Sequence, residues 1–160
     1  MTDEAINWGE GVRITAPALA SLHFEWTGDQ ERVQALDELP VEYTLRLSRI
    51  ASLSLAVEFG VHIVEIEGLT ASAAFRMVAS LVPDSPEAQK PEIAFRQFAA
   101  RVAPLAIYPF VREALTSAAV KAALPAMVLP ITNVGALFAQ EELQLPDPPD
   151  SAEQGQSSEE

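Results

Sequence analysis

The fold is decided by a stretch of strict alternation, VEYTLRLS at residues 41–48. Its odd-numbered positions are apolar and its even-numbered positions are polar, which predicts a strand with one buried face and one wet face. The same odd positions stay apolar from Leu53 to Ile63, so we expect a second strand after a turn near residues 48–52. The apolar phase then reverses and Gly68 follows, which indicates a bulge or the end of that strand.

Two weaker alternations lie on either side of this pair, at residues 22–26 and 73–81. Four strands joined by short links predict an antiparallel sheet. Prolines then make residues 83–91 a crossover loop, after which the apolar spacing becomes that of a helix. Strands first and helices second is the order of an α+β fold, with helices packed on one face of a four-stranded antiparallel sheet.

The helical part of the chain contains prolines that divide it. One helix face is predicted by the spacing of four apolar residues, Phe95, Phe98, Val102 and Leu105. Pro104 should end or kink this helix. Pro109 suits the first turn of a second helix that runs to about Ala123. Asn133 is a candidate N-cap for a last short helix that carries Val134, Leu137 and Phe138.

These patterns divide the chain into three parts. Residues 1–18 are expected to form an N-terminal arm, residues 19–145 one folded domain, and residues 146–160 a disordered acidic tail. Apolar residues make up 49% of the 160 residues, which is enough for a single hydrophobic core.

Composition argues against several kinds of function. The net charge is −13 and the sequence has no basic patch, so we expect no nucleic-acid partner. The absence of cysteine excludes disulfides, zinc knuckles and thiol chemistry. No apolar run reaches the roughly 18 residues that a membrane span needs, and the first residues lack the features of a secretory signal. We therefore expect a cytoplasmic protein that needs no cofactor and does not insert into membranes.

Catalytic sets are also missing from the sequence, so we expect a protein that is not an enzyme. The two histidines, His23 and His62, fall on the polar side of their strands, without a nucleophile elbow or a metal-spaced partner. Glu65 and Glu67 share a strand face, but no cleft is predicted beside them. An enzyme acting on a small ligand or thioester is the alternative, and it would have to use Glu113 and His62.

One part of the sequence resembles a known family. IYPFVREALTS at residues 107–117 resembles the signature of the SecB protein-export chaperones, an aromatic-Pro-aromatic-x-Arg-Glu sequence that opens the main helix of the family. LPITNVGALF at residues 129–138 resembles the Pro-Val-Asn-Phe-x-Ala-Leu-Phe segment of the family. The two helical segments belong to a match in register that covers residues 92–142. Separately, LHFE at residues 22–25 is similar to the first strand of the family.

The resemblance implies a fold, an assembly and a function. SecB-like proteins are α+β and form tetramers, as dimers of dimers. They bind non-native precursors in long apolar grooves without ATP and pass them to the SecA motor, which docks on an acidic face of the sheet. Some relatives instead protect the antitoxin of a toxin–antitoxin pair. We therefore expect a homotetrameric holdase that keeps unfolded precursor proteins competent for export, or alternatively a chaperone dedicated to one client such as an antitoxin.

Individual residues are candidates for these roles. The client-binding groove is predicted to be lined by six apolar residues, Tyr43, Leu45, Leu47, Val134, Leu137 and Phe138, with core packing or a subunit contact as the alternative for each. The resemblance places the start of the main helix in the oligomer, through Tyr108, Pro109, Phe110, Arg112 and Glu113. Glu25 matches the glutamate through which the family contacts SecA. The second acid of the family, four residues earlier, is Ser21 here, which puts the coupling to the motor in doubt.

Overall fold

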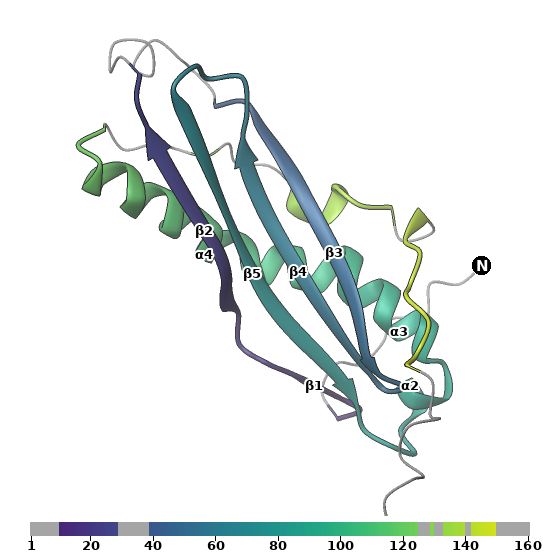
Figure 1. Cartoon of the computed structure of the whole chain (residues 1–160). Coiled ribbons are helices and arrows are strands. Elements are labelled where there is room, and N and C mark those ends of the chain that lie inside the picture. Colours follow the sequence, from purple (N-terminus) through teal and green to yellow (C-terminus); the bar gives the residue numbers. More distant parts are fainter. Residues whose placement is uncertain (1–9, 29–38, 125–128, 130–132, 140–141, 150–160) are drawn as a thin grey trace, which may run out of the picture.

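The structure, a computed structural model, describes residues 10–28, 39–124, 129, 133–139 and 142–149. One antiparallel sheet is covered on one face by a long helix (Figure 1). The strands are β1 (Val12–Ile14), β2 (Ala18–Trp26), β3 (Val41–Ala51), β4 (Ser54–Ile63) and β5 (Leu69–Leu81). The helices are α2 (Pro86–Gln89), α3 (Pro91–Gln97), the π-helical η1 (Phe98–Val102), α4 (Ala103–Lys121) and the 3-10 helix η2 (Val134–Ala136).

The sheet follows the alternation that the sequence predicts. Its order is β1-β5-β4-β3, with β2 also paired to β5. The odd-numbered residues of β3 from Val41 to Arg49 are half-buried, and the even-numbered residues from Glu42 to Ile50 are exposed. β4 ends at Ile63, just before the predicted change of phase. Beyond it, Gly68 takes a positive φ of 81°, a conformation that glycine adopts without strain.

The predicted number of four strands is wrong by one, because one edge of the sheet is formed by two strands in line. β1 and β2 both pair antiparallel with β5, and Pro17 between them has no N–H to donate. Thr15 bridges the gap: its N–H donates to the Val78 oxygen at 3.0 Å, and its hydroxyl accepts from the Val78 N–H at 2.9 Å. β1 lies within the expected N-terminal arm, and Val12 is buried there.

The helices pack on the face of the sheet that carries the odd-numbered residues of β3, β4 and β5 (Figure 1). α4 buries Ile107, Val111, Leu115 and Ala119, which are spaced four residues apart along one side of the helix. These side chains meet Val57, Phe59 and Val61 of β4, all at most 2% exposed. The expected α+β architecture, with its helices on one face of the sheet, is confirmed.

A π-helical turn changes the helix face that the sequence predicts. In η1 the N–H of Ala103 donates to the Phe98 oxygen, five residues back. The additional residue moves the buried stripe, so Phe95 and Phe98 are fully buried, whereas Leu105 is 54% exposed. The wider turn directly precedes Pro104, whose ring would clash with the preceding turn of a regular α-helix.

The prediction that Pro109 begins a second helix is wrong, since Pro109 lies inside α4. An interior proline destabilises a helix by about 3 kcal/mol. Ile107 and Val111 on either side of it are fully buried, and burying each such side chain contributes about 1.5–3 kcal/mol. Packing against the sheet therefore offsets the proline.

The C-terminal part runs back along the helix layer. The predicted last helix is the single turn η2, and the side chain of Asn133 makes no capping hydrogen bond. Beyond it, Leu143 and Leu145 pack against the core, and Arg96 Nε donates to the Leu143 oxygen at 3.4 Å. Residues 1–9 of the predicted arm and 150–160 of the predicted tail lie outside the described residues.

Candidate functional site

Four aromatic rings from separate parts of the chain meet beside β3, and we call them the aromatic cluster: Tyr43, Phe59, Tyr108 and Phe138. The Tyr43 and Phe59 ring centroids are 6.1 Å apart with an interplanar angle of 16°. Phe138 meets Phe59 edge-on at 6.1 Å, and Tyr108 lies 6.5 Å from Tyr43. Offset and edge-on pairs at such distances are attractive beyond their burial.

The register of the β3–β4 hairpin builds this cluster. Tyr43 lies opposite Val61 and Leu45 lies opposite Phe59, so Tyr43 and Phe59 are diagonal neighbours on the helix side of the sheet. Phe59 is fully buried, while Tyr43, Tyr108 and Phe138 are half-buried. The cluster therefore has a closed base and a rim that solvent reaches.

The environment of Tyr108 in the cluster shifts the pKa of its hydroxyl. Burial raises the pKa of the Tyr108 hydroxyl above its usual value, and the neighbouring Tyr43 raises it further. Arg112, one turn along α4, opposes the increase through its positive charge. The Tyr108 ring packs against that of Tyr43 at the rim of the cluster.

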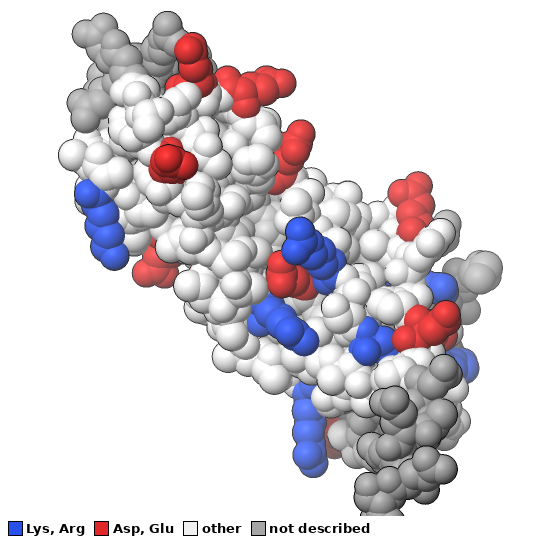
Figure 2. All heavy atoms as spheres, in the orientation of Figure 1, with Lys and Arg blue, Asp and Glu red and all other residues white. Residues whose placement is uncertain are grey.

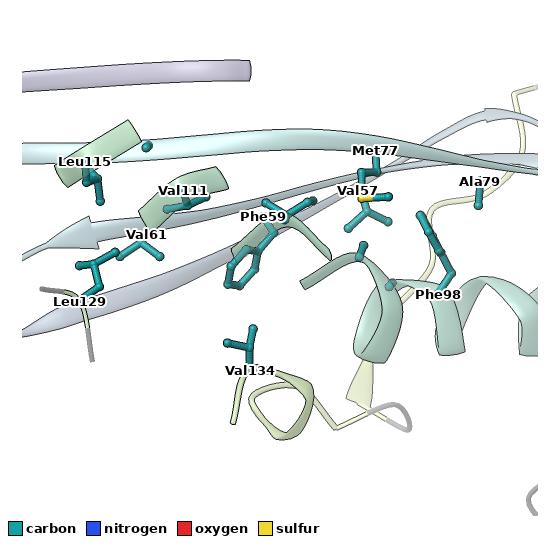
Figure 3. Close-up of a cluster of buried hydrophobic side chains, with 14 of the residues drawn as sticks. Val57, Phe59, Val61, Met77, Ala79, Phe98, Val111, Leu115, Leu129 and Val134 are labelled. Carbon is teal, nitrogen blue, oxygen red and sulfur yellow. The ribbon is translucent and has the colours of Figure 1, made fainter. Parts of the chain in front are cut away.

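The structure places most of the six predicted groove residues around this cluster. Leu45 and Leu47 follow Tyr43 on the same side of β3, and Leu137 precedes Phe138; all are half-buried against the core. Val134 fits the core-packing alternative instead: it is 2% exposed and points toward Phe59 (Figure 3), so it supports the cluster from within. Val134 is the first residue of η2, directly after Asn133, and its side chain is buried there.

Sequence reasoning missed Phe59 and assigned Tyr108 only to the oligomer. Phe59 shares its odd parity with Tyr43, and the short turn between β3 and β4 fixes their register, so this member of the cluster had a sequence signal. The place of Tyr108 depends on the phase of α4, which the π-turn shifts, and no sequence pattern carried that information.

The outer face of the sheet, opposite the helices, holds the predicted docking residue. Glu25 on β2 is exposed, with a carboxylate oxygen 3.8 Å from Nε2 of His23. Ser21 lies on the same face of the same strand, opposite Ala74. The pairing puts three arginines and three glutamates on the outer face of the strands, namely Arg13, Arg46, Arg76, Glu25, Glu42 and Glu58. Basic and acidic side chains lie side by side near its middle in Figure 2, so the middle of this face is not uniformly acidic.

The residues predicted to open the main helix point in different directions. Tyr108 faces β3, whereas Phe110 lies toward the other edge of the sheet, with its ring centroid 5.8 Å from that of Phe75. Pro109 and Glu113 are exposed and Arg112 is half-buried. Three apolar side chains of α4 are left largely uncovered, Leu105 at 54%, Phe110 at 43% and Val120 at 58% exposure.

The described residues were also compared with what a metal site, a membrane span or a catalytic site would need. No group of three or more His, Asp or Glu side chains in this part of the chain is placed to hold a metal ion. None of the described helices is long and apolar enough to cross a membrane. His23 and His62 both lie on the outer face of the sheet, as their parity predicts, and Glu65 and Glu67 are exposed.

Comparison with solved structures identifies the architecture. The SecB-like chaperone Rv1957 of Mycobacterium tuberculosis, solved in complex with a ChAD peptide from the Rv1956 HigA1 antitoxin, matches with a TM-score of 0.60. The match covers 77% of this chain and 91% of that chain, at 20% sequence identity. The chain has a SecB-like fold. A Streptococcus agalactiae protein of unknown function matches with a TM-score of only 0.38, at 12% identity over 75% of this chain and 97% of that one.

The sequence comparisons found no match. No family model matches the chain, and no curated protein matches it either. The SecB-like fold therefore rests on the arrangement of strands and helices.

Proposed function

We propose that this chain is a SecB-like chaperone that binds a dedicated polypeptide client and shields it without nucleotide, cofactor or a catalytic step. The observation that carries the proposal is the aromatic cluster on a SecB-like scaffold: two half-buried rings, Tyr43 and Phe138, pack on the fully buried Phe59, and the half-buried Tyr108 packs on Tyr43. The Mycobacterium protein with this fold was solved with a peptide from an antitoxin, which favours a client of that kind.

The cluster suits a client with apolar side chains. Unfolded segments that differ in sequence are held best by adaptable apolar surface, and a rim of tyrosine, phenylalanine and leucine offers it. Each Leu- or Phe-sized client side chain that becomes buried contributes about 1.5–3 kcal/mol before the cost of ordering the segment. Several such contacts on one client give tight binding although each is weak alone.

The outer face of the sheet favours a dedicated client over general export. The resemblance implies that SecA docks on an acidic face, and here three arginines balance three glutamates on it. Ser21 stands in place of one of the two acids that the family uses. Holding of export precursors for the SecA motor is the second candidate function, which the exposed Glu25 on this face favours.

We also propose that the chain works in the cytoplasm as a homotetramer, a dimer of dimers. Leu105 and Val120 on α4 are more than half exposed and Phe110 is 43% exposed. Apolar side chains on the open side of a main helix are suited to packing against the helices of another subunit. Light scattering should give a mass near four subunits, and a strict monomer contradicts this part of the proposal.

The holding activity is tested by suppression of aggregation. The purified chain is mixed with a chemically denatured, slow-folding protein, and light scattering is followed on dilution of the denaturant. Suppression at a near-stoichiometric ratio is expected. No suppression at several-fold excess refutes the chaperone function.

A matched pair of variants locates the binding surface. Phe138→Ser should weaken suppression, because it removes a half-buried ring from the rim of the cluster. Leu22→Ser is the control: Leu22 is 45% exposed on β2, at the other edge of the sheet. Equal loss in both variants places the binding surface elsewhere.

Capture in cells distinguishes the two candidate functions. Mild crosslinking, affinity purification and mass spectrometry should recover one dominant polypeptide if the client is dedicated. A broad set of exported precursors together with the SecA motor supports the export function instead.

A further inference from the structure

A row of polar side chains crosses the outer face of the sheet, on the side opposite the aromatic cluster. Glu42 of β3 lies opposite His62 of β4. On the other side of His62, the register places Ser72 of β5 and then His23 of β2. Residues directly opposite each other on one face have Cβ atoms about 4.5–5.5 Å apart. We call these four residues the polar row, in which a serine lies between two histidines.

The hydrogen-bond pattern of the sheet brings Ser72 and His62 closest together. The Leu81 N–H donates to the Leu53 oxygen at 2.8 Å, which makes these two residues a hydrogen-bonded pair of the β4–β5 ladder. Hydrogen-bonded and non-hydrogen-bonded pairs alternate along antiparallel strands, and the β4–β5 register has no shift. His62 and Ser72 are therefore a non-hydrogen-bonded pair, the kind in which side chains approach most closely. A ring nitrogen of His62 can thus reach the Ser72 hydroxyl.

Each histidine of the polar row also has a carboxylate beside it. Glu42 lies opposite His62. An oxygen of Glu25 is 3.8 Å from Nε2 of His23, which is longer than a hydrogen bond and leaves the ring able to turn toward Ser72. Ser72 and His62 are half-buried, whereas His23 and Glu42 are exposed. The sheet therefore supports the row from below, and a small molecule can approach it from solvent.

The side chains next to the polar row leave space for a substrate. Two residues along each strand, about 7 Å away, the adjacent row consists of small residues, namely Ser21, Ala74, Gly60 and Thr44. The row after that is charged and contains Arg76, Glu58 and Arg46. A band of small side chains thus separates two rows of larger ones, and a short acyl group fits over this band beside Ser72.

The residue types of the polar row are those of acyl transfer. A serine hydroxyl becomes an effective nucleophile when a base takes its proton and a third group holds that base. His62 is placed to act as the base, and Glu42 is placed to orient it. The charge that develops on the substrate carbonyl oxygen needs a donor, and a ring N–H of His23 on the other side of Ser72 suits this role.

We propose that the polar row is an acyl-transfer site that hydrolyses esters of small carboxylic acids through Ser72. This activity is additional to client binding, which needs no catalytic step. The open position of the row implies weak binding of the substrate, so the esters that react are those with a good leaving group.

The reaction needs only the ester and water. The Ser72 oxygen bonds to the ester carbonyl carbon while its proton passes to His62. The bond from that carbon to the leaving alcohol then breaks, and His62 returns the proton to the alcohol, which leaves an acyl group on Ser72. A water molecule, losing a proton to His62, attacks the acyl carbon. Release of the carboxylic acid restores the serine hydroxyl.

Hydrolysis of p-nitrophenyl acetate by the purified full-length chain tests the proposal. Ser72→Ala should lower the second-order rate constant by about tenfold or more. Ser80→Ala is the matched control, because Ser80 lies on the same face of β5 and its hydroxyl is 3.0 Å from that of Ser54, away from the polar row. The control should hydrolyse the ester at the rate of the unaltered chain. Equal rates in the unaltered chain and Ser72→Ala refute the proposal.

Trapping the acyl group distinguishes a serine nucleophile from simple catalysis by a surface histidine. After a short incubation with the ester and an acid quench, peptide mapping by mass spectrometry should find an acetyl group on Ser72 and none on Ser80. Acetylation of lysine or histidine alone refutes the proposal, as does hydrolysis that His62→Ala removes and Ser72→Ala retains. The mapping uses the unaltered chain, so its result does not depend on the folding of a variant.

The role of His62 is tested by chemical rescue. His62→Ala should lose acetylation of Ser72, and added imidazole should restore part of it by replacing the missing base. The measured quantity is the acetylated Ser72 peptide, because free imidazole also consumes the ester. Acetylation of His62→Ala at the unaltered rate without imidazole refutes this role. Glu42→Gln should slow acetylation several-fold and leave KM unchanged, since Glu42 positions His62 and does not touch the ester.

The outcome is independent of the chaperone function. The aromatic cluster lies on the helix side of the sheet and the polar row on the outer face, so Ser72→Ala should suppress aggregation as well as the unaltered chain does. Absence of ester hydrolysis refutes the acyl-transfer site and leaves client binding intact. Absence of aggregation suppression refutes the proposed function and leaves the acyl-transfer site intact.

Discussion

Side chains of β4 point alternately toward the helices and toward the outer face of the sheet. Both sets include buried residues, but these are buried for different reasons. Toward α4, Phe59 and its neighbours are large and are covered by the helix layer. On the outer face, Ala56 and Gly60 are covered although they have almost no side chain, because neighbouring strands stand close around them. Burial alone therefore does not predict the effect of a substitution. On the helix side the loss of volume is costly, and on the outer face the gain of volume is.

The largest effect is expected at Phe59, where α4 covers the sheet. Phe59→Ala should lower the free energy of unfolding by about 3–5 kcal/mol, because it removes a fully buried ring and leaves a cavity. Urea denaturation monitored by circular dichroism measures this change. Glu58→Ala, one position along on the outer face, is the control and should change stability by less than about 1 kcal/mol. Similar losses at both positions contradict the difference between the faces.

Arg49 shows that the helix-side layer also contains a buried charge. Its side chain is 4% exposed and 2.9 Å from a Glu92 oxygen of α3, with the guanidinium 4.6 Å from the Phe95 ring centroid. Nη2 donates to the Ser52 oxygen at 2.7 Å, and Nε donates to the Ala51 oxygen at 3.3 Å. The β3–β4 turn, which contains neither glycine nor proline, is therefore held by a side chain that also anchors the helix.

Arg49→Ala should accordingly destabilise the fold by about 2–4 kcal/mol, through lost hydrogen bonds and lost packing. Arg49→Lys keeps the charge but not the planar group that reaches all these partners, so it should recover only part of the loss. Urea denaturation of both variants measures the two effects. Full recovery by lysine means that the charge alone matters.

Gly60 is the outer-face position at which added volume has no space. A Cβ at Gly60 would lie 2.9 Å from each of three atoms, the Ala73 oxygen, the Ala74 Cβ and the Thr44 Oγ1. Replacing a strand glycine by alanine stabilises by up to about 1 kcal/mol where it fits. Here the clash with fixed backbone should reverse the sign, with a loss of about 1–3 kcal/mol in thermal or urea unfolding. A stabilised Gly60→Ala variant means that the strands move apart easily. Ser72→Ala, on the same face, is the control.

The sequence predicts strongly periodic features and fails where a local irregularity changes the phase. The alternation of residues 41–48 determined the inner and outer faces of β3, and with them the positions of Tyr43, Leu45 and Leu47. The proline pattern suggested two helices, but the π-turn at η1 and the packing around Pro109 keep the helix continuous. A helix phase that is set by tertiary packing is not encoded in local spacing. For this reason Tyr108 was not predicted as a member of the cluster, and Leu105 was wrongly expected on the buried face.

The pKa of Tyr108 gives the helix side of the sheet a dependence on pH. Because burial raises this pKa in the folded chain, the unfolded chain loses the proton first as the pH rises. The corresponding stability is complete below the unfolded pKa of about 10 and is lost above it. Urea denaturation at pH 9 and at higher pH should show a decline that is weaker in Tyr108→Phe. An identical decline in both proteins assigns the alkaline effect to other groups.

The smallest effect is expected at Arg46, on the outer face of β3. Its Nη1 lies 3.8 Å from the Glu58 Oε1, with the two side chains 81% and 30% exposed, so water competes for both partners. Arg46→Ala should change the free energy of unfolding by no more than about 0.5 kcal/mol at any salt concentration. A loss of more than about 1 kcal/mol in urea denaturation means that Arg46 stabilises the sheet itself. The outer face would then contribute to stability as the helix side does.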